Sequence, residues 1–387
     1  MSDNVSKIHF PQPKKLIWRI LLFLGIALFV LAVVAIIVLR DRINLDAAQR
    51  WLKYLNVSDA SEAGTFSYDA HTSNRYANVS DGLVVASSAG VSVFSDSGKL
   101  LCEHQMPMKT PTLQTQGKSV LCYDAAGNCL CCLNAAGEVG LELECPQPIL
   151  DADVAFDGAC CYSTFETGYK SVLYVYNPEG TLSYRWLSSS HYLPICTVSN
   201  DAKYLAAVEM TEKDGKYQSS ALVFDTRKEE PIAEFSVGND LVFDLELLSD
   251  NSILVIAESG IGYYQLNGSL IGNYPYEDAS LIDFDNGGSG FLTLMMNMNK
   301  EGNHNTIITL SKNGAKLGSH TFEEEILDFS VCGRYICVLT ASGLYIYDSS
   351  MSLYAEKEDF GLSSGAVQRS DGTVIVLTSD QGSILMP

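Results

Sequence analysis

The feature that most constrains this chain is a structural unit that recurs from residue 65 onward. The unit is clearest in residues 326–359, which contain four short runs rich in β-branched and aromatic residues. These runs are Ile326–Val331, Tyr335–Thr340, Leu344–Tyr347 and Leu353–Glu356, separated by turns rich in Gly, Ser and Asp. A four-stranded antiparallel unit that recurs about every 40 residues predicts an all-β fold, the β-propeller.

The number of blades follows from the turns. The turn between the first and second strands recurs eight times, and the turn between the third and fourth strands recurs seven times. The last unit lacks a fourth strand, whereas the run Thr65–Asp69 stands before the first unit without a partner. We therefore predict eight blades, with seven as the alternative. The ring closes when strands within Ala366–Met386 pair with Thr65–Asp69, which removes the exposed sheet edges.

A second constraint is the segment Ile20–Leu39, twenty residues without a charge. At helical rise it is roughly 30 Å long, the thickness of the hydrocarbon layer of a bilayer. Trp18 and Arg19 precede it and Arg40 follows it, as interfacial anchors do. The run is longer than the apolar region of a cleaved signal peptide, so we predict an uncleaved single-span transmembrane helix.

The chain then divides into four parts. We predict a cytoplasmic tail at 1–19, the transmembrane helix at 20–39, a juxtamembrane helix and linker at 40–64, and the propeller at 65–387. In the juxtamembrane part the apolar residues share one helical face, and they are Ile43, Ala47, Trp51 and Leu55. This segment extends the membrane helix or lies as an amphipathic collar near the membrane surface. We expect its apolar face to pack against the propeller; a membrane-surface or partner-binding role is the alternative.

The orientation of the chain in the membrane depends on its basic residues. Lys and Arg flank the span equally, with four near each end, so the positive-inside rule barely discriminates. An outward-facing tail would carry the basic cluster Lys14, Lys15 and Arg19 across the membrane, whereas long downstream domains translocate largely regardless of charge. We predict that the propeller lies outside the cytoplasmic membrane; a propeller that faces the cytoplasm is the alternative.

The propeller is strongly acidic. The whole chain has a net charge of −21, and residues 1–55 carry +5, which leaves −26 for the rest. Nucleic acids and anionic lipid surfaces repel such a domain. We predict no nucleic-acid partner.

The blade pattern resembles that of a known superfamily. Alternating apolar residues, a polar turn, a glycine and a further apolar residue occur in VSVFSDSGKLL, LYVYNPEGTLS and IITLSKNGAKLG. This pattern resembles the PQQ-like and WD40-like propeller superfamily over residues 65–387, although the WD dipeptide, the paired kelch glycines and the quinoprotein tryptophan motifs are absent. With its single N-terminal span, the chain is similar to uncharacterised bacterial families of membrane-anchored propellers. This resemblance implies a fold and a location, and it carries over no catalytic residue.

Motifs for chemistry are absent from the sequence. Neither HExxH, GxSxG, a P-loop nor a GxGxxG that opens a helix occurs. The eleven cysteines form no CxxC pair and lie mostly in strand-like runs, so we expect small buried side chains rather than disulfides or a zinc site. The run Asp283–Gly287 is similar to the start of a calcium loop, but its spacing and missing Glu fit a strand that enters a turn. We assign no catalytic residue, cofactor or metal.

One asymmetry points to a partner. The turn between the second and third strands is long in three units, at Phe165–Lys170, Thr211–Gln218 and Asn297–Asn305. In a propeller these turns share a face with the connections between blades, such as Ser188–Pro194. Because functional residues concentrate on loops that a rigid scaffold displays, we predict a partner-binding rim; surface insertions without a function are the alternative. The rim residues are Tyr169, Lys170, His191, Tyr192, Lys213, Tyr217, Lys300 and His304.

The sequence thus predicts a non-enzymatic, membrane-anchored propeller outside the membrane, which acts as a protein-interaction scaffold or as a sensor of a cell-envelope ligand. An alternative from another class is a propeller hydrolase or lyase on an envelope polysaccharide or peptide, since propeller enzymes gather catalytic residues from several blades. A third is a cytoplasm-facing interaction scaffold.

Overall fold

The computed structural model describes residues 22, 62–238, 240–298, 305–358 and 363–387. Apart from Leu22 and the first residues of the first strand, the predicted tail, transmembrane helix and juxtamembrane segment lie outside the described residues. Within the described ranges, no helix is both long and apolar enough to cross a membrane. Residues 57–387 form one compact unit.

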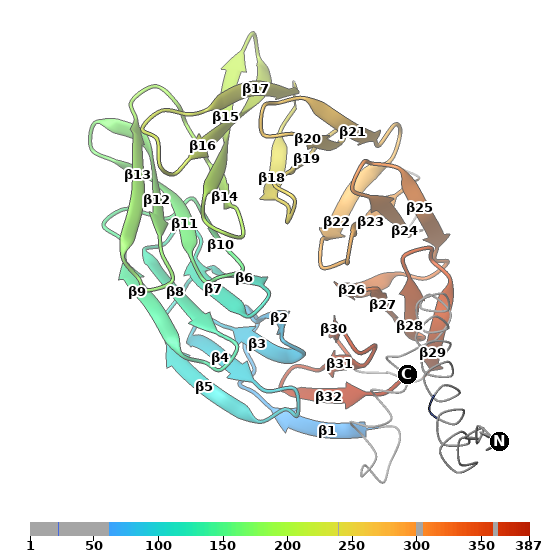
Figure 1. Ribbon diagram of the computed structural model, residues 1–387. Helices are drawn as coiled ribbons and strands as arrows, with labels where there is room; N and C mark the ends of the chain where they lie inside the picture. Colours follow the sequence, from blue (N-terminus) through green and yellow to red (C-terminus); the bar gives the residue numbers. More distant parts are fainter. Residues whose placement is uncertain (1–21, 23–61, 239, 299–304, 359–362) are drawn as a thin grey trace, which may run out of the picture. The chain divides into compact units, whose positions relative to one another are not determined.

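In the described part of the chain, thirty-two strands form eight four-stranded antiparallel sheets, each of which is one blade of a ring (Figure 1). In blades 1–7 the strands run in sequence order from the inner to the outer edge. Blade 1 consists of β2 (Arg75–Val79), β3 (Gly82–Ala86), β4 (Gly90–Phe94) and β5 (Leu100–Gln105). Blade 2 consists of β6 (Pro111–Gln116), β7 (Ser119–Asp124), β8 (Cys129–Asn134) and β9 (Val139–Glu144). Blade 3 consists of β10 (Asp151–Val154), β11 (Cys160–Glu166), β12 (Tyr169–Tyr176) and β13 (Leu182–Ser188). Blade 4 consists of β14 (Ile195–Val198), β15 (Tyr204–Lys213), β16 (Lys216–Asp225) and β17 (Ala233–Gly238).

The second half of the ring has the same plan. Blade 5 consists of β18 (Val242–Leu247), β19 (Ile253–Ala257), β20 (Gly260–Tyr264) and β21 (Leu270–Pro275). Blade 6 consists of β22 (Ser280–Asp285), β23 (Phe291–Asn297), β24 (Asn305–Ser311) and β25 (Lys316–Thr321). Blade 7 consists of β26 (Ile326–Cys332), β27 (Tyr335–Thr340), β28 (Gly343–Asp348) and β29 (Leu353–Glu358). Blade 8 consists of β30 (Gly365–Gln368), β31 (Val374–Leu377), β32 (Gln381–Leu385) and, at its outer edge, β1 (Glu62–Ser67).

The core lies between neighbouring blades. The second strand of a blade is covered on both faces, so strands such as β3 and β27 are buried along their whole length. One apolar cluster, for example, joins Val84 and Val93 of blade 1 to Val120 and Cys122 of blade 2. Each fully buried Val or Leu contributes about 1.5–3 kcal/mol. The ring of apolar clusters therefore holds the blades together.

The predicted closure is confirmed. Strand β1 pairs with β32, with Thr65 opposite Ser383 and Phe66 opposite Gly382. The ring of Phe66 also contacts that of Phe94 in blade 1, at 5.0 Å between centroids. The ring therefore contains eight blades, not seven, and the first and last described strands share one of them.

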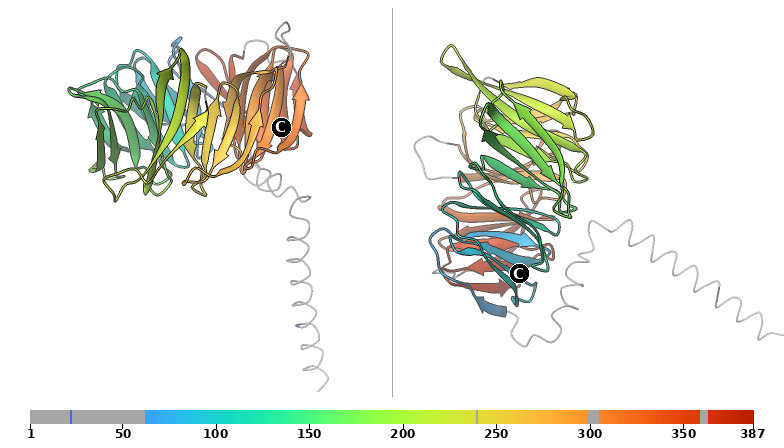
Figure 2. Two further views of the ribbon diagram at one scale, coloured as in Figure 1. Left: turned by 90° about the horizontal axis from the view of Figure 1, so that it is seen from above. Right: turned by 90° about the vertical axis from the view of Figure 1, so that its left-hand side faces the viewer.

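Two of the three predicted long turns are not loops. Strands β15 and β16 stay paired as far as Lys213 opposite Lys216, and only Asp214 and Gly215 form the turn, with φ of 56° and 75°. The right-hand view of Figure 2 shows this hairpin extending beyond its neighbours. Strands β11 and β12 are likewise paired as far as Glu166 opposite Tyr169. An Asp-Gly pair takes positive φ readily and favours a two-residue hairpin, so the added residues lengthen the strands. Residues 299–304 of the third turn lie outside the described residues.

The cysteines behave as predicted from their strand positions. All eleven are free thiols, and eight of them are buried. The other three, Cys102, Cys129 and Cys332, are half-buried. Burial raises the pKa of Cys131 to about 12, as expected for an unreactive thiol in an apolar core.

Candidate functional site

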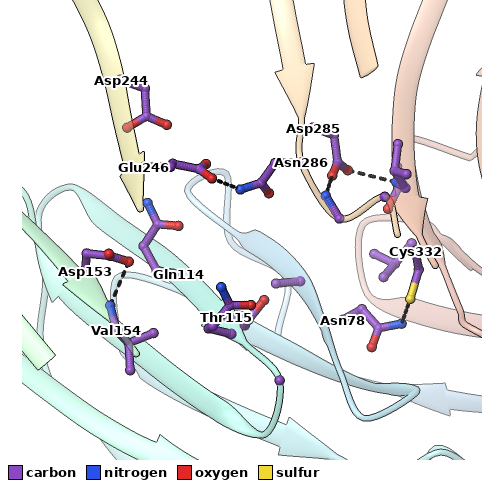
Figure 3. A pocket seen from close by; sticks show the side chains of 18 of the residues that line it. Asn78, Gln114, Thr115, Asp153, Val154, Asp244, Glu246, Asp285, Asn286 and Cys332 are labelled. Atoms are coloured by element: carbon purple, nitrogen blue, oxygen red, sulfur yellow. Dashed lines mark hydrogen bonds between the residues drawn. The ribbon is translucent and has the colours of Figure 1, made fainter. Parts of the chain in front are cut away.

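The inner strands surround a channel with a cavity volume of about 1450 Å³ (Figure 3). Side chains that point inward from β10, β18, β22 and β26 make its wall acidic. Eight acidic residues line the channel, against two basic ones, Arg75 and Lys312. The seven acidic residues on the inner strands are Asp151, Asp153, Asp244, Glu246, Asp283, Asp285 and Asp328.

Several of these carboxylates join one blade to the next. Asp151 Oδ2 accepts a hydrogen bond of 2.9 Å from the Cys196 N–H, and its Oδ1 accepts one of 3.1 Å from the Tyr123 hydroxyl. Asp153 Oδ2 accepts from Thr197 Oγ1 at 2.8 Å and from the Val198 N–H at 3.0 Å. Both carboxylates of blade 3 thus bind N–H groups on the inner edge of blade 4, where the sheet has no further strand to pair with.

The same arrangement recurs farther round the ring. Asp285 Oδ2 accepts from the Val331 N–H in blade 7 at 2.8 Å, and Asp328 Oδ2 accepts from the Ala366 N–H in blade 8 at 2.8 Å. Glu246 accepts from the Asn286 amide of blade 6 (Figure 3). These five carboxylates are structural links between blades as well as part of the channel wall.

Asp244 and Asp283 differ from them. Asp244 Oδ1 accepts from the N–H of Leu245, and Asp283 Oδ1 accepts from the N–H of Phe284, each at 2.8 Å and each within its own strand. In the described part of the chain, neither carboxylate receives a hydrogen bond from a neighbouring blade. Their second oxygens are therefore available to a ligand in the channel.

The protonation of the channel changes near neutral pH. Burial raises the pKa of Asp151 and of Glu246 to about 7. It raises the pKa of Asp285 and of Asp328 to about 6. The pKa of Asp244 is also raised, first by burial and then by the charge of Glu246. Crowded carboxylates in a partly desolvated channel repel one another, and a cation that enters the channel relieves this repulsion.

No group of three or more His, Cys, Asp or Glu in the described ranges is placed to hold a metal ion. The seven carboxylates on the inner strands come from four different blades. A larger ligand with several cationic groups can contact carboxylates that are spread over several blades.

The structure brings some of the predicted rim residues together. Lys170 Nζ donates to the Ser190 carbonyl at 3.1 Å, and His191 Nδ1 lies 2.8 Å from Glu209 Oε1. Tyr192 lies beside β15, because its carbonyl accepts from the Met210 N–H at 3.2 Å. Lys170 of blade 3 therefore shares one surface with His191 and Tyr192, which lie in the connection between blades 3 and 4.

The remaining rim residues are more scattered. Tyr169 and Tyr217 are exposed at the ends of the β11–β12 and β15–β16 hairpins. Lys213 is the last residue of β15, and Lys300 and His304 lie outside the described residues. The partner-binding rim stays a prediction.

The channel carboxylates were not recognised as a site in the sequence. Their signal is a repeated pattern, Asp followed two residues later by an acceptor side chain, in the first strand of blades 3, 5, 6 and 7. The pattern reads Asp151-Ala-Asp153, Asp244-Leu-Glu246, Asp283-Phe-Asp285 and Asp328-Phe-Ser330. One copy was considered only as the start of a calcium loop.

Comparison with known proteins gives a family and a fold. Residues 54–381 match the model of a family described as a family of unknown function, DUF5711. No curated protein matches the chain. The C-terminal WD40 domain of Sif2 has a similar structure, with a TM-score of 0.55 and 13% identity over 85% of this chain and 96% of that one. The Cps50 (Swd1) β-propeller of Myceliophteria thermophila matches with a TM-score of 0.46 and 11% identity over 83% and 98%. The similarity to the Sif2 domain confirms a WD40-like propeller at the level of the fold.

Proposed function

The chain belongs to DUF5711, a family of unknown function, and from its channel we propose that it is a non-enzymatic binding scaffold that takes cationic groups of a ligand into the propeller. The observation that carries this proposal is the row of carboxylates on four inner strands, against two basic residues. A narrow, partly desolvated channel lined by one sign of charge concentrates ions of the opposite sign. The rest of the propeller acts as the rigid support that holds these groups in place.

The test uses a cationic probe and two charge-matched variants. We expect spermidine or a short oligolysine to bind the full-length chain, with an affinity that falls as salt is added. The double variant Asp244→Asn/Asp283→Asn removes two channel charges that take no part in links between blades, and we expect about tenfold weaker binding.

The control is Glu103→Gln/Glu144→Gln, which removes the same charge from the exposed outer strands β5 and β9. Calorimetric titration compares the three proteins. Equal affinity of both double variants for the probe would show that the channel is not the binding site.

We further propose that Ile20–Leu39 anchors the chain in the membrane and that the propeller is displayed outside the cytoplasmic membrane. The uncharged run and the basic cluster before it support this orientation. Protease treatment of intact cells with an opened wall should remove a C-terminal epitope and leave the N-terminal one. Protection of both epitopes until lysis would place the propeller in the cytoplasm.

A protein partner can also contact the predicted rim, where Lys170, His191 and Tyr192 come together. We expect the triple variant Tyr169→Ala/Tyr192→Ala/Tyr217→Ala to lose partners that co-purify with the native chain. If every such interaction persisted in the variant, the rim would be a set of surface extensions without that role.

One observation favours an enzyme as the second candidate. The pKa of Asp151 and of Glu246 is about 7, which suits a general acid at neutral pH. Hydrolysis or elimination of an envelope polysaccharide or peptide by the purified chain, abolished in Glu246→Gln, would favour this candidate over the scaffold.

A further inference from the structure

Three consecutive blades share a local irregularity at the same place. Where the inner strand pairs with the second strand in blades 5, 6 and 7, the pairing skips one residue. The skips lie between Val242 and Asp244, between Leu281 and Asp283, and between Ile326 and Asp328. The extra residue of a β-bulge leaves the ladder and its side chain is re-aimed.

In each blade the extra residue is large, apolar and exposed. Phe243 is 53% exposed, and Ile282 and Leu327 are each 46% exposed. The inner pairs of blades 1, 2, 3, 4 and 8 run without such a skip. The propeller can therefore be built without these bulges, and folding does not require their exposed apolar side chains.

The bulges lie at the mouth of the channel. Each extra residue directly precedes a channel carboxylate, Asp244, Asp283 or Asp328, and Leu327 itself lines the channel. In blade 5 the bulge lies on the face of the turn between the second and third strands, since the Glu258 N–H donates to the Leu241 carbonyl just before β18. In blade 7 the Ser342 N–H of the corresponding turn donates to Glu324 Oε2, just before β26. We call the six residues Phe243, Asp244, Ile282, Asp283, Leu327 and Asp328 the bulge crescent.

The chemistry of the bulge crescent selects its occupant. Apolar side chains and carboxylates alternate along it, and within the described ranges the carboxylates of Asp244 and Asp283 receive no hydrogen bond from a neighbouring blade. A small cation is a poor occupant because it has no apolar surface that could cover Phe243. An anionic lipid surface is also a poor occupant because the carboxylates repel it. A polypeptide with alternating apolar and basic side chains matches both features.

We propose that the bulge crescent docks a segment of a partner protein in which Lys or Arg alternates with large apolar residues. The apolar side chains of that segment cover Phe243, Ile282 and Leu327, and its cationic groups bind Asp244 and Asp283 at the entrance of the channel. This inference rests on the proposed function, because the same channel attracts the basic side chains.

The test compares two labelled peptides of equal length and charge, one alternating Lys with Leu and the other alternating Lys with Ser. Fluorescence anisotropy measures their binding to the full-length chain in a mild non-ionic detergent. We expect the Lys-Leu peptide to bind at least about tenfold more tightly than the Lys-Ser peptide, since burial of its apolar side chains strengthens binding.

Two triple variants locate the apolar contact. Phe243→Ser/Ile282→Ser/Leu327→Ser should abolish the preference for Lys-Leu and leave the binding of Lys-Ser unchanged. The matched control is Leu100→Ser/Leu182→Ser/Leu353→Ser, which removes similarly exposed side chains from the outer strands and should keep the preference. Thermal unfolding confirms that each variant is folded.

The outcomes separate the two proposals. Equal binding of both peptides to the native chain, or an equal loss in both triple variants, would overturn the bulge crescent and leave the cationic channel in place. Failure of both peptides to bind would overturn the channel as well.

Discussion

At the scale of single residues, the channel carboxylates have two roles that their surroundings separate. Asp153 and Asp285 accept N–H groups of the next blade, so their charge is partly compensated inside the protein. Asp244 has no such link in the described structure, and its charge is left to water and to a ligand. A chain that needed these carboxylates only to join blades would gain nothing from Asp244.

This separation gives the first prediction, which concerns stability and pH. The carboxylates with raised pKa hold protons more tightly in the folded chain than in the unfolded one, where the pKa is about 4. Their contribution to stability is complete below that value and is lost as pH rises through the folded values of about 6 for Asp285 and about 7 for Glu246. We expect the free energy of unfolding in urea to fall between about pH 5 and about pH 8.

A variant serves as the control for this pH dependence. Asp244→Asn removes a carboxylate whose pKa burial raises, and it breaks no link between blades in the described structure, so we expect it to stabilise the chain more at pH 8 than at pH 5. Carboxylates with lowered pKa, such as Asp225, finish titrating below this window. Stability that is constant or rises toward pH 8 would contradict the prediction.

The channel residues could not be predicted from the sequence for a physical reason. Asp153 and Val198, whose N–H donates to the Asp153 carboxylate, are 45 residues apart, so their link depends on the blade period and not on local pattern. The alternation of Asp283 and Asp285 is visible in the sequence. It predicts a channel wall only when the innermost strand of each blade is known. The predicted rim used exposed loops, a signal that the sequence does contain.

At the scale of elements, glycines let one blade fit against the next. The turn between the third and fourth strands of blade 6 lies on the outer strand of blade 5, where a Cβ on Gly272 would be 1.9 Å from the Asn313 carbonyl oxygen. The corresponding turn of blade 2 places Gly137 against Cys102 of blade 1. The turn glycines seen in the sequence therefore serve contacts between blades as well as the turns themselves.

The second prediction tests this fit. Gly272→Ala should destabilise the chain by about 2–3 kcal/mol, because its methyl group meets the backbone of the next blade, which cannot move aside. Gly140→Ala is the control, since its Cβ would lie 3.4 Å from the nearest atom, the Pro178 oxygen. Thermal melts should show a fall of several degrees for Gly272→Ala and less than about 0.5 kcal/mol of change for Gly140→Ala. Similar melting temperatures for the two variants would contradict the role of Gly272 in the contact between blades 5 and 6.

Strands and tight turns were predictable because their residues alternate or continue in short apolar runs. The predicted strands of residues 326–359 agree with β26–β29 to within two residues at each end. The two long turns were misjudged because a count of residues between strands does not distinguish a loop from a longer hairpin. The Asp214-Gly215 pair was the available signal for the hairpin.

At the scale of the whole molecule, the ring depends on pairing between its first and last described strands. The number of blades could be predicted because the last unit lacks a fourth strand and the unpaired run near residue 65 can supply it. Two further links support the closure, since Arg369 Nη2 donates to the Asp96 carbonyl at 2.8 Å and the Tyr68 hydroxyl donates to the Thr378 carbonyl at 2.6 Å. The C-terminal strands of blade 8 are thus linked both to the segment that follows β1 and to blade 1.

The third prediction follows from this closure. Deletion of residues 365–387 removes three strands of blade 8, leaves β1 unpaired and exposes apolar residues of blades 7 and 1. We expect residues 57–364 to aggregate or to melt without cooperativity, whereas residues 57–387 stay soluble and melt in one transition. Size-exclusion chromatography and calorimetry compare the two, and a soluble truncated chain with a single sharp transition would refute the requirement for closure.

The blade shared by the first and last described strands also determines when the ring can close during synthesis. Thr65 and Ser383 contact each other across 318 positions of sequence, and a ribosome that adds roughly 5–20 residues per second needs roughly 15–60 s to travel between them. During that interval β1 has no strand to pair with, and blade 1 lacks the neighbour that covers its far side. A chaperone or the translocation machinery that shields this early segment would therefore act before the last blade emerges, and the ring can form only after synthesis of this region is finished.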